Sequence, residues 1–87
     1  MKYYEEKIVD DFTLVRVFLP GIEYPWHRDA EDRIIKVLET GVLWRFQKDN
    51  ELPIELKVGE KLKVKSNSFH RLISGTGTLV LQITKIV

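Results

Sequence analysis

The sequence has no cysteine among its 87 residues, so it can form neither a disulfide framework nor a cysteine zinc site. An excess of one charge is also lacking, because 14 Lys and Arg side chains balance 13 Asp and Glu, for a net charge of +1. Nucleic-acid binding depends on a basic excess over one surface, so no nucleic-acid partner is expected. No apolar run approaches the roughly 18 residues that a membrane-spanning helix needs, so no membrane partner is expected either.

Residues 1–6 contain acids where a secretion signal has a basic region followed by an apolar stretch. We therefore expect a cytoplasmic protein. The length allows one domain, spanning residues 1–87. A domain this small buries only about 60–65% of the surface of its unfolded chain. Two copies paired through a sheet edge or face would bury more, which favours a homodimer.

Short runs in which apolar and polar residues alternate dominate the sequence, and alternation is typical of β-strands. Such runs cover residues 13–19, 33–38, 42–47, 54–58, 61–65, 69–73 and 78–87. Turns rich in glycine and proline separate several of them, as at Pro20-Gly21 and Gly75-Thr76-Gly77. Helical periodicity is nearly absent, and only residues 30–37 could form a turn of helix. The pattern predicts an all-β sandwich or small barrel.

The sequence contains only two histidines, His27 and His70. In a strand, residues two apart project from the same face, so His27 and Asp29 would point the same way. With His70 from another strand they would form a two-histidine, one-carboxylate site. Such a site suits Fe, Mn, Ni or Zn and leaves positions open for water or substrate. Alternatively, both histidines are ordinary polar residues, one in a surface loop and one capped by a neighbour.

Residues 21–41 resemble the first sequence motif of the cupin family, which runs from a glycine over five residues to His-x-His. Five residues separate Gly21 from His27, and Asp29 stands where the second motif histidine belongs. Glu39 and Gly41 resemble the strand end and turn that close the motif.

Residues 59–70 resemble the second cupin motif. Gly59-Glu60 matches its opening turn and His70 its single histidine, while Lys65 replaces its proline. The resemblance covers most of the chain. It implies a single-domain double-stranded β-helix, or jelly-roll barrel, with a divalent metal in its mouth.

The sequence departs from the first motif where the family has a glutamate ligand, because that position falls near Arg33. An arginine offers only hydrogen-bond donors and cannot ligate a metal. We expect Arg33 to point into the barrel with Ile35 and Val37 and to bind an anionic small molecule. The alternative is a surface arginine paired with Asp32 or Glu31.

Two tryptophans, Trp26 and Trp44, could line the barrel mouth, as aromatic side chains often line ligand sites. Filling of the core is the other interpretation of both.

The sequence therefore predicts a small cupin-like protein that binds a divalent metal (Fe, Mn, Ni or Zn) and a small anionic ligand, without indicating whether it is an enzyme. One alternative is a metal-free module that binds a sugar or an organic acid. A second is an oxygenase dependent on Fe(II) and 2-oxoglutarate, which resembles this chain in its His-x-Asp…His order. Against that second alternative, no basic residue that could hold the co-substrate lies between Leu72 and Thr84.

Overall fold

The computed structural model describes residues 4–86, and every regular element in this range is a β-strand. The strands are β1 (Tyr4–Ile8), β2 (Thr13–Phe18), β3 (Asp32–Glu39), β4 (Arg45–Lys48), β5 (Ile54–Glu55), β6 (Lys61–Val64), β7 (His70–Ile73) and β8 (Leu79–Ile86). The predicted all-β class is therefore confirmed. Within residues 4–86 there is no helix of the length and hydropathy needed to cross a membrane.

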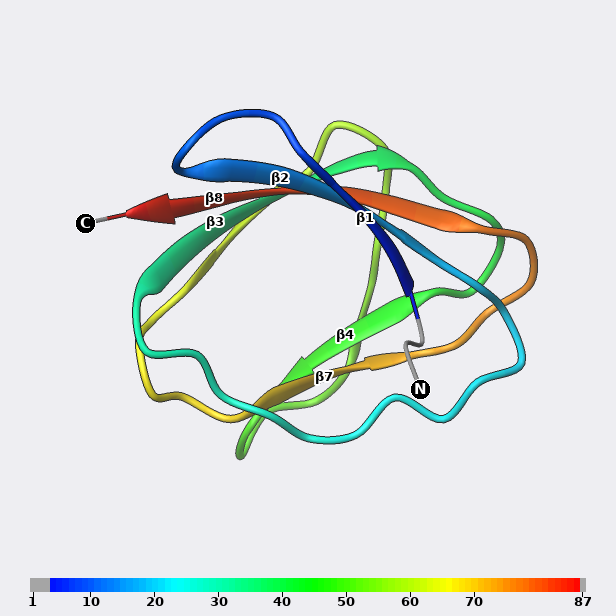
Figure 1. The fold of residues 1–87 in the computed structure, drawn as a ribbon. Helices are drawn as coiled ribbons and strands as arrows, with labels where there is room; N and C mark the ends of the chain where they lie inside the picture. Colours follow the sequence, from blue (N-terminus) through cyan, green and yellow to red (C-terminus); the bar gives the residue numbers. More distant parts are fainter. Residues whose placement is uncertain (1–3, 87) are drawn as a thin grey trace.

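The strands form two antiparallel sheets that face each other. The larger sheet has the order β1-β2-β8-β3-β6 and the smaller sheet the order β5-β4-β7. Figure 1 shows β1, β2, β8 and β3 on one side of the molecule and β4 and β7 on the other. The two inner faces enclose the interior of a small barrel.

The alternation read from the sequence determines which side chains fill that interior. On β2, Leu14 and Phe18 are buried, whereas the residues between them are half-buried. The same pattern on β8 buries Leu79, Leu81 and Ile83. The inward side chains of both sheets meet in one cluster of buried residues. Burial of this apolar surface is the main favourable contribution to folding.

Four local predictions need correction. Strand β1 was not expected, because four of its five residues are exposed and its sequence shows no inward apolar face. Of the strand predicted over 54–58 only β5 forms, because residues 57–60 make a turn in which Glu60 N donates to Lys57 O. The strand predicted over 42–47 begins at Arg45. No helical turn forms between residues 30 and 37, since β3 begins at Asp32.

Candidate metal centre

The first element of the site is strand β7, which begins at His70 and turns its imidazole inward. His70 is 4% exposed and is the one buried polar residue among residues 4–86. Its Nδ1 lies 2.9 Å from the carbonyl oxygen of Ser68. A carbonyl oxygen can only accept a hydrogen bond, so Nδ1 carries the proton of the neutral ring. The lone pair of His70 is then on Nε2, which faces the interior of the barrel.

The second element is the irregular segment between β2 and β3, which contains His27 and Asp29. His27 lies in an isolated β-bridge with His70. The amide N of His27 donates to the His70 carbonyl at 3.0 Å, and the amide N of His70 donates to the His27 carbonyl at 2.9 Å. The bridge brings the two rings to 4.3 Å between centroids. The prediction of a regular strand over His27 and Asp29 is therefore wrong, although the two side chains do converge.

The imidazole of His27 is oriented in the same way as that of His70. Its Nδ1 lies 3.3 Å from the carbonyl oxygen of Pro25. In the neutral ring, this contact places the proton on Nδ1 and leaves the Nε2 lone pair available. A backbone carbonyl that fixes the tautomer through the second ring nitrogen is the usual support of a histidine that binds metal.

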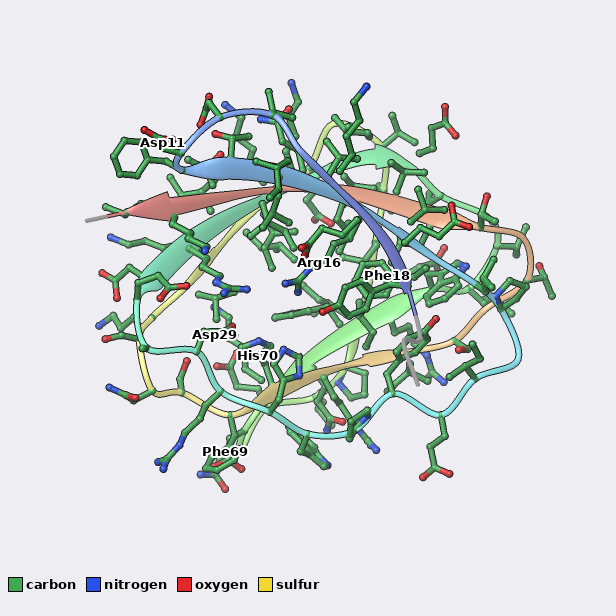
Figure 2. The ribbon with its side chains drawn as sticks, viewed as in Figure 1. Asp11, Arg16, Phe18, Asp29, Phe69 and His70 are labelled. Carbon is green, nitrogen blue, oxygen red and sulfur yellow. The ribbon has the colours of Figure 1, made fainter. Side chains whose placement is uncertain are left out.

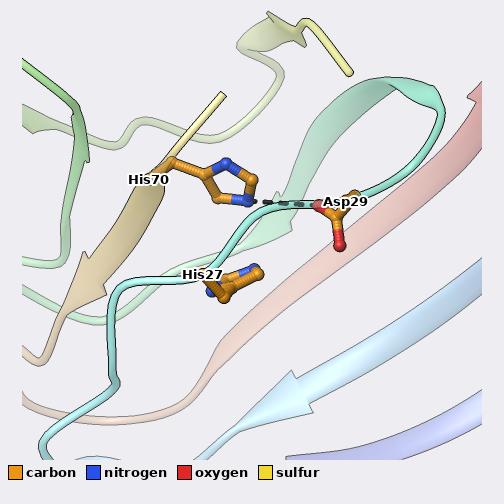
Figure 3. A group of neighbouring side chains, drawn as sticks. All are labelled: His27, Asp29 and His70. Atoms are coloured by element: carbon orange, nitrogen blue, oxygen red, sulfur yellow. Dashed lines mark ion pairs between the residues drawn. The ribbon is translucent and has the colours of Figure 1, made fainter. Parts of the chain in front are cut away.

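Asp29 brings a carboxylate to the same point. Its backbone is held by Asn67, whose amide N donates to the Asp29 carbonyl at 2.7 Å. Its Oδ2 lies 3.2 Å from Nε2 of His70, as Figure 3 shows. This oxygen is buried and has no hydrogen bond of good geometry to any described residue. Oδ1 lies on the side of Arg33, whose Nη1 is 3.4 Å away.

A buried carboxylate oxygen without a hydrogen bond is costly, and here it faces the lone pair of a second acceptor. Burial lowers the pKa of His70 below its ordinary value, and the nearby His27 adds to that effect, while Ser68 and Asp29 oppose it. The ring therefore stays neutral near pH 7 and supplies no proton between Nε2 and Oδ2. A cation placed between the two atoms would satisfy both.

The donor set and its spacing fit one metal ion. One ligand atom each from His27, Asp29 and His70 lies within 4.8 Å of the other two. Bonds of about 2.0–2.2 Å from nitrogen and oxygen to a shared divalent ion allow at most about 4.4 Å between any two ligand atoms. The three residues predicted as ligands are thus brought together, and a small inward shift of their side chains would let them share one ion.

The three side chains lie at the wall of a cavity of about 160 Å³. Apolar side chains supply most of the remaining wall, among them Phe18, Ile35, Phe46, Leu72, Leu81 and Ile83. Figure 2 shows Asp29, His70, Arg16 and Phe18 directed toward this interior. The cavity lies below the range of about 300–1,000 Å³ usual for sites of drug-sized ligands. It therefore suits a molecule of few atoms.

Two arginines, Arg16 and Arg33, line the same cavity, and only Arg33 was predicted to lie there. Arg33 lies on β3 on the same side as Ile35 and Val37, as predicted, and its side chain is 11% exposed. Its Nε and Nη2 both donate to Oε1 of Glu31, at 2.9 and 2.7 Å. Arg16, on β2, was missed, although it alternates with Leu14 and Phe18 and so belongs to their inward face.

Neither tryptophan lies at the cavity wall. Trp44 is completely buried in the core, where its Nε1 donates to the Gly77 carbonyl at 3.0 Å. Trp26 is 41% exposed, and the guanidinium of Arg71 lies 4.7 Å from the centre of its ring. The structure thus gives Trp44 the core position that was the other interpretation, and Trp26 a surface position.

Comparison with solved structures identifies the class of fold. The DMSP lyase DddQ from Ruegeria pomeroyi matches 98% of this chain with a TM-score of 0.81 and 15% identity. KdgF from Halomonas sp. matches 98% with a TM-score of 0.75 and 16% identity. Cobalt(II) HppE in complex with its substrate matches 85% with a TM-score of 0.67 and 21% identity. These proteins have the cupin fold, so the predicted cupin-like barrel is confirmed.

The similarity has defined limits. The chain covers 47% of DddQ and 43% of HppE, but 82% of KdgF. At these identities the likeness concerns the fold. No family model matches the sequence, and no curated protein matches it.

Proposed function

We propose that this protein binds one divalent transition-metal ion through His27, Asp29 and His70. The observation that carries the proposal is the buried Oδ2 of Asp29, which lacks a hydrogen bond to any described residue and lies 3.2 Å from Nε2 of His70. Imidazole and carboxylate ligands suit Fe, Mn, Ni and Zn. Two solved structures of one neighbour, HppE, support metal chemistry in a barrel of this kind, since one contains cobalt(II) and the other iron(II).

Three protein ligands would leave coordination positions for water or a small molecule at the cavity. A metal held in this way supplies a Lewis acid that polarises a bound oxygen. The chain itself would exclude bulk water with its apolar wall and would hold the ligand atoms in place. The second part of the proposal is a small anionic ligand in this cavity, whose wall includes the two arginines Arg16 and Arg33.

Arg33 stands where the resembled motif has a metal-binding glutamate. It would not bind the metal itself but would position the metal-binding side chain of Asp29. Its guanidinium already donates twice to Glu31 and lies 3.4 Å from Oδ1 of Asp29. The positive charge of Arg33 beside Oδ1 of Asp29 holds the carboxylate so that Oδ2 faces the imidazoles. We therefore assign Arg33 to the orientation of Asp29.

Metal content tests the proposal. The untagged protein is loaded with Co(II) or Zn(II), dialysed and measured by elemental analysis. We expect about one ion per chain in the wild type and none in Asp29→Asn or His70→Gln, which keep the size of the side chain. Asp11→Asn, in the exposed turn between β1 and β2, serves as the control and should retain the ion. A wild type that retains no metal under these conditions would contradict the proposal and leave a metal-free binding module.

We also propose that two copies pair in solution, as the small size of the domain suggests. The supporting feature is β1, an edge strand that pairs with β2 on one side. The apolar side chains of Ile8, at the end of β1, and of Val9 and Phe12, in the turn that follows, are exposed. Light scattering during gel filtration distinguishes a mass near 20 kDa from the 10.2 kDa of one chain.

A further inference from the structure

Arg16 is a largely buried cation for which neither the sequence motifs nor the metal site accounts. It lies on β2 between Leu14 and Phe18, and its side chain is 16% exposed. It contributes to the wall of the cavity that also includes His27, Asp29 and His70. Figure 2 shows its side chain directed from the larger sheet toward the interior.

The contacts of Arg16 fix its position but leave most of its donors available. Its Nε donates to Oε1 of Glu6 at 2.7 Å, and its guanidinium carbon lies 4.4 Å from the centre of the Tyr4 ring. A guanidinium has five N–H donors, and the Glu6 contact uses one. The terminal nitrogens, Nη1 and Nη2, have no hydrogen bond to any residue between 4 and 86. A buried cation of this kind is expected to meet an anion.

Arg33, the second arginine of the cavity, differs in this respect. All three of its nitrogens are directed at carboxylates of the chain itself, those of Glu31 and Asp29. It is therefore already neutralised where it lies. Of the two arginines at this wall, Arg16 has the free donors that a bound anion requires.

We infer that Arg16 binds the carboxylate of a short-chain organic acid whose other end reaches the metal centre. The orientation of this ligand rests on the proposed metal site, whereas the carboxylate contact does not. The paired terminal nitrogens of a guanidinium match the two oxygens of a carboxylate. One arginine that shares its charge with Glu6 favours a monoanion over a doubly charged phosphate. The apolar wall between the two ends, with Ile35, Leu81 and Ile83, suits a short hydrocarbon chain.

The ligand class then follows from the cavity. One end carries the carboxylate, the middle is aliphatic, and the far end carries an oxygen that can bind the metal. Short hydroxy acids have these three parts, and few atoms fit within about 160 Å³. We use 3-hydroxybutyrate as the probe and 3-hydroxybutyramide, its uncharged analogue of the same shape, as the comparison.

Titration calorimetry on Zn(II)-loaded protein, with both probes, tests the inference. In the wild type we expect the acid to bind at least tenfold more tightly than the amide. Arg16→Gln should remove this preference and leave the affinity for the amide unchanged. Arg45→Gln, a change at an exposed arginine on β4, should leave the preference intact. A preference that persists in Arg16→Gln, or an acid that binds the wild type no better than the amide, would overturn the inference.

Two further experiments distinguish a failure of this inference from a failure of the proposed metal site and from misfolding of the variant. In metal-free wild type, NMR titration should still show the acid shifting the Nε–Hε signal of Arg16. If metal analysis fails but this shift occurs, only the metal proposal is wrong. Should Arg16→Gln not fold, Arg16→Lys keeps the charge and the stem but loses the paired donors. We then expect a reduced but measurable preference for the acid, and an undiminished preference would overturn the inference.

Discussion

The two ends of the barrel interior differ, and strand β3 passes from one to the other. Its inward face begins at Arg33 in the cavity, continues with Ile35 and ends at Val37, which is completely buried. Strand β8 runs in the opposite direction, with the completely buried Leu79 at the packed end and Leu81 and Ile83 at the cavity. One end therefore contains ionisable groups around a cavity and the other closely packed apolar side chains. The difference indicates that, along the same strands, the residues at the packed end mainly stabilise the fold, whereas those at the cavity end could bind a metal or a small molecule.

The packed end is expected to show the largest effect on stability. Leu79→Ala removes a completely buried side chain and should lower the free energy of unfolding by about 2–5 kcal/mol, because a cavity remains. Urea unfolding measures this loss. The folded fraction should still bind one Zn(II) per chain. A variant that loses metal at full stability would contradict the separation of the two ends.

At the cavity end, a substitution should affect metal binding strongly and stability only weakly. Asp29→Asn is expected to abolish metal binding but to change the free energy of unfolding of the metal-free protein by no more than about 1 kcal/mol. The reason is that Oδ2 makes no hydrogen bond that the substitution could remove. Urea unfolding in chelator, with Asp11→Asn as the matched control, measures this. A loss as large as that of Leu79→Ala would mean that Asp29 is part of the structural core.

A smaller effect on metal affinity is expected from a change at Arg33, because Arg33 contacts the metal-binding residue Asp29 and not the metal itself. Arg33→Gln removes the charge beside Oδ1 of Asp29 and should weaken metal binding about 10- to 100-fold, as loss of a residue that orients a ligand does. The three ligands remain, so the ratio of metal to protein at saturation should stay at one. Competition with a chelator measures the affinity. An unchanged affinity would remove the positioning role.

The smallest effect concerns pH. The pKa of His70 is lowered in the folded protein by burial, so below about pH 6.5 the unfolded chain binds this proton more readily. The metal-free protein should therefore lose stability as the pH falls from 7 to 5, whereas above pH 7 His70 contributes nothing to the dependence. Melting temperatures measure this. His70→Gln should flatten the dependence, and an equal fall in both proteins would assign it to other groups.

Strands were predictable from the sequence wherever one face is buried and the other exposed. Such a strand needs apolar residues at every second position, and this alternation is visible in the sequence. The runs at 13–19, 33–38 and 78–87 correspond to β2, β3 and β8 for this reason. Strand β1 was not predictable, since its hydrogen bonds to β2 are made by the backbone and four of its five side chains are exposed.

The site was predictable in part. The residue types and the resembled motifs indicated His27, Asp29 and His70 correctly as a group that converges, but strand spacing was the wrong reason. What joins them is a backbone bridge between segments 43 positions apart, which no local pattern reveals. Arg16 could have been found from its alternation with Leu14 and Phe18. The location of Trp44 depends on packing between the sheets, which its own neighbours in the sequence do not determine.

The reciprocal backbone hydrogen bonds between His27 and His70 have a consequence for how the site could be altered. Since main-chain atoms hold the two histidines together, their spacing does not depend on which side chains surround them in the connection between β2 and β3. Pro25, which is exposed and lines the cavity, is therefore open to substitution. The entrance to the cavity could be reshaped there by directed evolution while the pair of imidazoles keeps its geometry.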